Sequence, residues 1–372
     1  MKKIFLMLML LAVAHIDASA CISAIVSPQR SSEGAPLMWK HRDSKFSSTR
    51  VDYVRGGKYL YTAVVSSTDE NKNSIYAGIN EKGLGFMSLT TYSLPCATEA
   101  EYEACTRKRI GGSMQRLGLR NCATVDEFEE MLRTTKRRNK YNSNIGVADG
   151  TGAVAYFEIW DLGYRRYDVS EREEGFDVRA NFSFADTLKG KRNASERRYN
   201  LIMQEMSAHN GKFTPQQFID YSRSYNSIKF GNVLESDEKY YCANHTVPRN
   251  STVGAFVLVC DAKCPRMLVM NGHTVSSLAV PVYVQAGENI PQCVHGDAMR
   301  LLSNDFRAKA YSKSKSGRNV LNKEVVRAVL NIKQPKVAMP STMPANITAF
   351  NARIDKTFSK HAKRVRKVLA KF

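Results

Sequence analysis

The chain has 372 residues, of which 43% are hydrophobic and 9% aromatic, and its 55 Lys and Arg against 35 Asp and Glu give a net charge of +20. This composition is typical of a globular protein and excludes a disordered or fibrous chain. The positive charge is uneven, because residues 301–372 hold 17 Lys and Arg against 3 Asp and Glu, a net charge of +14. A solvated helix surface is the simplest interpretation of that segment, and weak contact with an anionic envelope surface is the second. Because no stretch has the aromatic interleaving or fold signature of a nucleic-acid reader, we expect no nucleic-acid partner.

The N-terminus has the layout of a secretory signal peptide. Lys2 and Lys3 are followed by the apolar run IFLMLMLLAVA and by the small residues Ala18-Ser19-Ala20, which correspond to the charged, apolar and cleavage regions of such a peptide. We therefore predict that residues 1–20 are removed on export and that the mature protein is soluble in the periplasm. No later stretch reaches the roughly 18 consecutive apolar residues that indicate a transmembrane helix.

Cleavage after Ala20 would leave Cys21 at the new N-terminus, where three fates are open to it. Lipid-acceptor cysteines also follow small residues, although such sites prefer Leu three residues earlier and this chain has Ala18 there. Alternatively, Cys21 belongs to a four-disulfide set, since the chain has 8 Cys and an oxidising compartment favours disulfides. A nucleophilic Cys21 would keep its thiol free and leave at least one other cysteine unpaired. The alternative to the disulfide set is that several of the cysteines are simply buried thiols.

Strand patterns begin at the mature N-terminus. CISAIV and LMWKHRDS, joined by the turn SPQRSSEGAP, predict a hairpin that starts at Cys21. Further strands are predicted at YLYTAVVSS, at SIYAGINEKGLGFMSLTTYSL around a turn at Asn80–Gly83, and at SNIGVADGTGAVAYFEIWD and YRRYDV. Three more are predicted at STVGAFVLVCD, RMLVMNG and SSLAVPVYV.

Helical periodicity is clearest in the stretch GGSMQRLGLRNCATVDEFEEMLRTTKR and in SERRYNLIMQEMSAH, where Ser195 is the expected N-cap. A short helix is predicted at TPQQFIDYSRSY, with Thr214 as its cap and Pro215 in its first turn. Residues 301–372 are mostly helical in pattern. Strands joined by hairpins, rather than alternating with helices, predict an α+β fold of antiparallel sheets covered by helices.

An N-terminal cysteine carries its thiol and a free α-amine on one residue. Because an α-amine has a pKa of about 8, it can act as general base for its own side chain. Such a site also needs an anion near the amine and donors for an oxyanion. Asp43, across the first hairpin from Cys21, is the candidate for the anion, Asn181 offers an amide donor, and Arg198 is placed to orient the acids electrostatically. Individually, these residues are also typical of a surface ion pair, a loop cap and a solvated helix charge.

The motifs CISAIV, PLMWKHRDS, YAGINEKGLGFMSLTTYSL, GAVAYFEIWD, VRANFSF, ERRY and SLAVPVYV together resemble the N-terminal-nucleophile (Ntn) hydrolases of the linear-amide type. That superfamily includes the choloylglycine hydrolases, the penicillin V acylases and the isopenicillin N acyltransferase family. The resemblance implies a four-layer αββα sandwich of two antiparallel sheets. It also implies that Cys21 is nucleophile and base, that Asp43 contacts the nucleophile and its amine, that Asn181 is the oxyanion asparagine, and that Arg198 is an electrostatic arginine with Arg197 as its rival.

Two positions depart from the choloylglycine hydrolase pattern. Lys40 stands where those enzymes have an arginine three residues before the aspartate, and Thr90 stands where they have an oxyanion asparagine. The backbone N–H of Thr90 remains able to donate, so both departures weaken a bile-salt assignment and leave the amide-cleaving machinery in place. His41 is expected to be structural, because strand alternation is taken to point it away from the neighbours of Asp43.

The sequence therefore predicts a signal peptide at residues 1–20, an Ntn-hydrolase domain at 21–300 and a basic, mainly helical extension at 301–372. The expected activity is hydrolysis of a small-molecule N-acyl amide or a peptide through an acyl-enzyme. Acyl transfer to an amine and a lipid-anchored envelope protein without activity are the alternatives. We expect no cofactor and no metal site, because the histidines are scattered and Cys260 and Cys264 lack a second matching pair.

Overall fold

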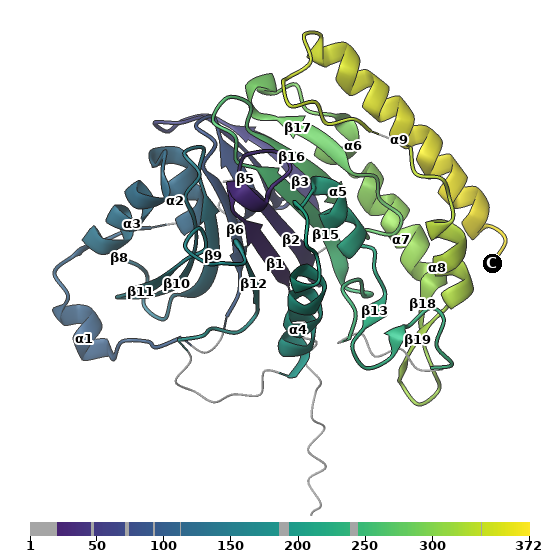
Figure 1. Cartoon of the computed structure of the whole chain (residues 1–372), viewed down its shortest axis with the longest axis horizontal. Coiled ribbons are helices and arrows are strands. Elements are labelled where there is room, and N and C mark those ends of the chain that lie inside the picture. Colours follow the sequence, from purple (N-terminus) through teal and green to yellow (C-terminus); the bar gives the residue numbers. More distant parts are fainter. Residues whose placement is uncertain are drawn as a thin grey trace, which may run out of the picture.

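The computed structural model describes residues 21–45, 48–70, 74–91, 94–111, 113–185, 193–238, 245–335 and 337–372. The predicted signal peptide at residues 1–20 and Cys242 lie outside the described residues. Within this part of the chain, two antiparallel sheets lie at the centre and helices cover them (Figure 1).

The first sheet has six strands among the described residues. Their spatial order is β12 (Phe176–Ala180), β1 (Ile22–Val26), β2 (Leu37–Asp43), β15 (Thr252–Val259), β16 (Arg266–Asn271) and β17 (Val280–Tyr283). The predicted N-terminal hairpin forms β1 and β2, with the short 3-10 turn Pro28–Arg30 between them. Since β12 pairs with the other side of β1, the strand that starts beside Cys21 has a neighbour on each edge.

The second sheet has seven strands within the described ranges. Their order is β11 (Tyr164–Asp168), β10 (Val154–Trp160), β9 (Asn142–Ala148), β6 (Gly85–Leu89), β5 (Ile75–Asn80), β4 (Tyr61–Ser66) and β3 (Thr49–Val54). Gly83 adopts a φ of +82° in the turn between β5 and β6, a conformation that glycine takes without steric cost. Short pairs complete the strands: β7 (Lys108–Arg109) with β8 (Thr135–Lys136), β13 (Asn226–Ser227) with β14 (Gly231–Asn232), and β18 (Tyr311–Lys313) with β19 (Asn319–Leu321).

The largest hydrophobic cluster lies between the two sheets. Ile25 and Met38 of the first sheet pack in it with Val64, Met87 and Tyr156 of the second, and all are fully buried. Because successive strand residues face opposite sides, the remaining apolar side chains form two outer clusters. One lies between the first sheet and helices α4 (Asn193–Ser207) and α5 (Pro215–Tyr221), and the other between the second sheet and helices α2 (Met114–Asn121) and α3 (Val125–Thr134).

The remaining helices are α1 (Glu99–Ala104), α6 (Gln292–His295), α7 (Ala298–Ala310), α8 (Lys323–Leu330) and α9 (Ile347–Leu369), with a 3-10 turn at Val284–Ala286. Met299 of α7, Val325 of α8 and Ile354 of α9 belong to the same cluster as Ile25. Residue 300 lies inside α7, so the C-terminal helices continue the core of the sandwich instead of following it as a separate body.

The predicted α+β sandwich of antiparallel sheets, with helices on both outer faces, is confirmed. Two local predictions differ. The periodic stretch around residues 111–137 forms two helices, because Thr124 caps a new helix by accepting a hydrogen bond from the N–H of Glu127. The N-cap predicted at Ser195 is wrong, since α4 begins at Asn193. Thr214 caps α5 as predicted, in a capping box with Gln217.

Two further expectations concern disulfides among the cysteines and a membrane-spanning helix. All seven cysteines among the described residues are free thiols, so none of the disulfides that the count of cysteines suggested is present among them. No helix of the described chain is both long and apolar enough to cross a membrane.

Candidate active site

Cys21 lies at the head of β1, between two neighbouring strands. Ile22 pairs with Ala180 of β12 on one side and with His41 of β2 on the other. If both antiparallel registers are continued by one residue, Cys21 is expected opposite Asn181 on one side and Arg42 on the other. Paired residues in a sheet share a face, so these three side chains face the second sheet together. Cys21 is 8% exposed.

Asn181 follows β12 and reaches across to the second sheet. Its Nδ2 donates a 2.6 Å hydrogen bond to the carbonyl of Thr90, directly after β6. A side-chain amide nitrogen carries two protons, so one N–H of Asn181 remains for another acceptor. Its Oδ1 is buried without a hydrogen-bond partner among the described residues.

A buried asparagine of the second sheet fixes the backbone around Asn181. Asn144 Nδ2 donates to the carbonyls of Ala180 and Phe182 at 3.4 and 2.7 Å, and Asn144 Oδ1 accepts from the Ser183 hydroxyl at 3.1 Å. These bonds hold the residues on both sides of Asn181, so the donor is positioned by the rigid sheet and not by its own loop alone.

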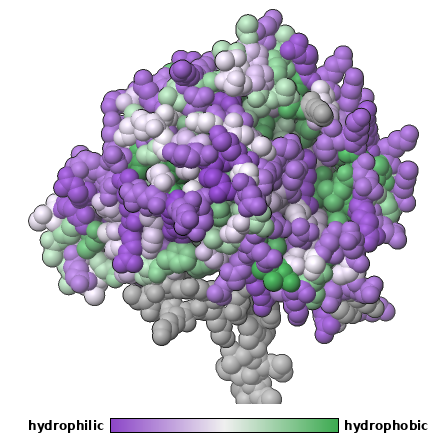
Figure 2. All heavy atoms as spheres, viewed as in Figure 1, coloured by the Kyte–Doolittle hydropathy of each residue, from purple (hydrophilic) through white to green (hydrophobic). Residues whose placement is uncertain are grey.

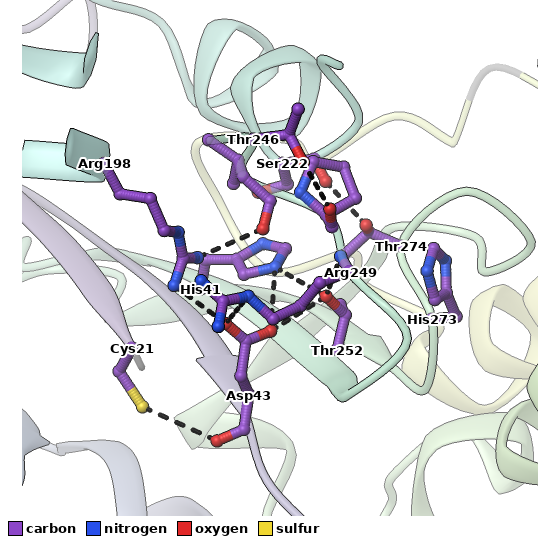
Figure 3. Close-up of polar contacts among 12 residues, drawn as sticks. Cys21, His41, Asp43, Arg198, Ser222, Thr246, Arg249, Thr252, His273 and Thr274 are labelled. Atoms are coloured by element: carbon purple, nitrogen blue, oxygen red, sulfur yellow. Dashed lines mark hydrogen bonds and ion pairs between the residues drawn. The ribbon is translucent and has the colours of Figure 1, made fainter. Parts of the chain in front are cut away.

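The carboxylate of Asp43 lies at the centre of a buried ionic cluster (Figure 3). Arg198 Nη1 contacts its Oδ2 at 2.8 Å, and Arg249 Nε lies 3.2 Å from the same oxygen. The Thr252 hydroxyl donates to Oδ1 at 2.8 Å, and His41 Nε2 lies 3.6 Å from Oδ1. Burial alone would raise the pKa of Asp43, but the two guanidinium groups outweigh it and hold that pKa well below its usual range.

Asp43 contacts the Cys21 thiol through its main chain and the ionic cluster through its carboxylate. Cys21 Sγ lies 4.0 Å from the main-chain oxygen of Asp43, while the carboxylate extends to the helix-covered face with Arg198 (Figure 3). Asp43 and Cys21 thus lie close together across the hairpin, while the predicted contact of the Asp43 carboxylate with the amine of Cys21 stays a prediction. The described contact between Cys21 and Asp43 involves the main chain of Asp43 and not its carboxylate.

The orientation predicted for His41 is wrong. Residues two apart in a strand share a face, so His41 points to the same side as Asp43. It lies within the cluster, with its Nε2 3.1 Å from the Thr252 hydroxyl. Burial lowers the pKa of His41 and favours the neutral ring, although the hydrogen bond to Asp43 acts in the opposite direction. Burial also distinguishes the two candidate arginines of α4, because Arg198 is fully buried and Arg197 is exposed.

Lys40 lies on the inter-sheet face of β2, where it pairs with Ser23, two residues after Cys21. It is 2% exposed, and its Nζ donates to the carbonyl of Tyr76 at 3.1 Å and to the carbonyl of Ser88. Burial lowers the pKa of Lys40 to about 8, with Cys21 acting in the opposite direction and Arg42 reinforcing the shift. The guanidinium of Arg42 stacks over the Tyr76 ring at 3.7 Å. Lys40 and Arg42 therefore make the inter-sheet face of β2 near Cys21 positive, and this favours a negative charge that develops there.

Sequence reasoning missed Arg249 and Thr252, which both contact Asp43. Thr252 reaches Asp43 through a β-bulge: Gly254 pairs with Arg42, but Thr252 pairs with Asp43, so one extra residue is accommodated between them. The motif PRNSTVG carries no recognisable chemistry, and only the pairing of β15 with β2 brings it to the site. Within the described residues, no group of three or more His, Cys, Asp or Glu is arranged to hold a metal ion.

Several solved structures resemble this one. A mutant of the conjugated bile acid hydrolase from Clostridium perfringens is 12% identical, with a TM-score of 0.47 over 72% of this chain and 92% of its own. Penicillin V acylase from Agrobacterium tumefaciens is 15% identical, with a TM-score of 0.47 over 71% and 86%. The Caenorhabditis elegans ortholog of N-acylethanolamine-hydrolyzing acid amidase is 17% identical, with a TM-score of 0.41 over 64% and 92%.

No protein-family model matches the sequence, and no curated protein is similar to it in sequence. At these identities and TM-scores, the likeness to the three solved structures carries no conclusion about activity. Any activity must therefore be argued from the residues around Cys21.

Proposed function

We propose that the protein is an N-terminal cysteine hydrolase that cleaves a linear N-acyl amide through an acyl-enzyme. Export across the cytoplasmic membrane and removal of residues 1–20 are part of this proposal, because they would free the amine of Cys21. The observation that carries it is the register of β1 and β12, which continued by one residue brings Cys21 opposite Asn181, whose side-chain amide retains an N–H beyond the one that donates to Thr90.

In the proposed first step, the α-amine of Cys21 takes the thiol proton and the sulfur attacks the amide carbonyl. The carbonyl oxygen becomes an oxyanion that accepts hydrogen bonds from Asn181 Nδ2 and from the backbone N–H of Thr90. A preorganised donor of this kind lowers the barrier by about 3 kcal/mol. The amine then returns its proton to the leaving nitrogen, which departs as an amine and leaves a thioester on Cys21.

In the second step, water attacks the thioester while the α-amine accepts a proton from it. The same oxyanion donors act again, and the acid leaves as the thiol is reformed. The cluster around Asp43 does not need to change its charge during this cycle. Its role in the proposal is to hold β2, and with it the end of β1, in a single position.

The test begins with the N-terminus of the exported protein. Intact mass and N-terminal sequencing should give a chain that starts at an unmodified Cys21. Alkylation with iodoacetamide must be mapped by peptide, because the exposed Cys96 and the half-buried Cys105 are also within reach of the reagent. A diacylglyceryl mass on Cys21, or a different first residue, would remove both nucleophile and base and refute the proposal.

The second stage is a substrate screen with N-acyl amino acids, acyl-homoserine lactones, bile salts, penicillin V and acylated peptides. Cys21→Ala should abolish release of acid from any substrate found, whereas Cys96→Ala, which removes an exposed thiol, should leave it unchanged. Trapping of a thioester mass on Cys21 would support the acyl-enzyme. Equal activity of the Cys21→Ala variant would show that the chemistry lies elsewhere.

A further inference from the structure

The C-terminal helix α9 has two faces of opposite character. One face packs on the protein and buries Ile354, Phe358, Ala362, Val365 and Leu369. The other face is open to solvent and carries basic side chains from Arg353 to the last turn of the helix. The exposed members of this basic face are Arg353, Lys356, Lys360, Lys363, Arg364, Arg366 and Lys367, with Lys371 just beyond the helix.

Acidic side chains barely offset this charge. Asp355, the acidic residue of α9, turns toward the protein and accepts from the backbone N–H groups of Gln292 and Cys293 at 3.0 and 2.9 Å. Among the described residues, Arg366 is the member of the basic face that has an ion pair, with Asp305 at 2.9 Å. Most of the positive charge on the face is therefore uncompensated.

The spacing makes this arrangement unfavourable for an isolated helix. Lys356, Lys360, Lys363 and Lys367 follow one another at intervals of four, three and four residues, which places them side by side on one helix surface. Like charges at such spacing destabilise a helix by a few tenths of a kcal/mol per pair. A solvated helix typically avoids that repulsion by interleaving acidic residues, which α9 does not do on this face.

The shape of the face favours a flat partner. A helix of 23 residues extends about 35 Å at 1.5 Å per residue, and α9 runs along the outer margin of the molecule (Figure 1). Hydrophilic side chains gather along that margin in Figure 2. The exposed face of α9 itself offers no aromatic rings on which bases could stack, as single-stranded nucleic acid would require.

We propose that the basic face of α9 docks the protein on an anionic phospholipid surface. Phosphate headgroups present a plane of negative charge, and each Lys or Arg near such a plane contributes about 1 kcal/mol of binding. The inference does not rest on the proposed hydrolase activity. It identifies the surface that would hold the protein against an anionic membrane without insertion into the bilayer.

The experiment is sedimentation of the full chain with vesicles of phosphatidylcholine containing phosphatidylglycerol, and with vesicles of phosphatidylcholine alone. The test variant combines Lys356→Gln, Lys360→Gln, Lys363→Gln and Lys367→Gln. The matched control combines Lys58→Gln, Lys82→Gln, Lys212→Gln and Lys263→Gln, which removes the same charge from exposed lysines outside α9. All three proteins share residues 1–20, so any contribution of that segment cancels.

The wild-type protein and the control should bind the anionic vesicles and lose binding at high salt. The α9 variant should bind at least about a hundredfold more weakly at low salt, with an unchanged thermal unfolding midpoint. Equal losses in variant and control would show that net charge, not α9, governs binding and would overturn the proposal. Absence of wild-type binding to anionic vesicles would also overturn it, as would tighter binding of double-stranded DNA at the same salt concentration.

Discussion

Arg198 Nη1 lies 2.8 Å from Asp43 Oδ2, and both side chains are fully buried. The pair joins helix α4 to strand β2, so a residue 155 positions away in the sequence holds the strand that runs beside Cys21. Arg249 approaches the same carboxylate oxygen at 3.2 Å, which makes the cluster one anion between two cations.

The first prediction concerns this pair. Arg198→Gln removes one of the two guanidinium groups that stabilise a buried carboxylate, and such a loss costs about 3 kcal/mol of unfolding free energy. Because the pKa of Asp43 is then less depressed, the acid-unfolding midpoint should move to higher pH. Urea unfolding at several pH values measures both effects. The neighbouring Arg197→Gln changes an exposed side chain and should alter stability by less than about 0.5 kcal/mol; equal effects of the two variants would contradict the role of the cluster.

The second prediction separates the two oxyanion donors. Asn181→Ala should reduce kcat for amide hydrolysis by about 10²–10³, because it deletes a side-chain donor. Thr90→Ala keeps the backbone N–H and should retain activity within a few-fold. Steady-state kinetics on one substrate from the screen would decide this, with thermal unfolding as the check that both variants are folded. A severe loss in Thr90→Ala alone would show that its side chain, not its backbone, serves the reaction.

The third prediction is a pH dependence that arises from Lys40. Its pKa falls from 10.5 to about 8 in the folded protein, so the unfolded chain binds more protons between these values. The free energy of unfolding should therefore rise across that window, by up to about 3 kcal/mol. Lys40→Met should lack this rise, although other groups titrate in both proteins. The difference between the two pH profiles, measured by urea unfolding from pH 7 to pH 10.5, isolates the lysine; parallel profiles would refute its lowered pKa.

The fourth prediction follows from the shared core of the sandwich and the C-terminal helices. A chain that ends at residue 300 loses most of α7 and all of α8 and α9, and it uncovers the cluster around Met299. Exposed apolar patches of this kind lead to aggregation. A chain that ends at Leu369 lacks only exposed residues and should behave as the full chain. Size-exclusion chromatography distinguishes them, and a monodisperse, folded protein ending at residue 300 would show that the helices are dispensable.

The strands and helices of the sandwich could largely be predicted from the sequence, because alternation and helical periodicity are local signals. The turn at Asn80–Gly83 and the cap at Thr214 carry their own turn chemistry and lie where they were expected. The placement of Ser195 failed, since a helix start depends on the preceding residues as much as on the capping side chain.

The site was predictable only in part. Cys21 and Asp43 are brought together by one hairpin, whose register follows from the turn between its strands. Thr252 at the start of β15, and Arg249 just before that strand, come to Asp43 because β15 pairs with β2 in the folded sheet. No local pattern encodes that long-range pairing. The unpartnered Oδ1 of Asn181 likewise emerges only when the surroundings of the side chain are known.

The bulge in β15 fixes the number of residues that the chain must have between Arg249 and Gly254. If the strand continued from Gly254 without it, Val253 would stand opposite Asp43 and Thr252 would turn to the other face. The apolar side chain of Val253 would then stand where the hydroxyl of Thr252 donates to the carboxylate of Asp43. Gly254 adds a second constraint, because a Cβ there would lie 2.9 Å from the carbonyl of Met270. Insertions and deletions tolerated in the surface loops should therefore be excluded from the segment between Arg249 and Gly254.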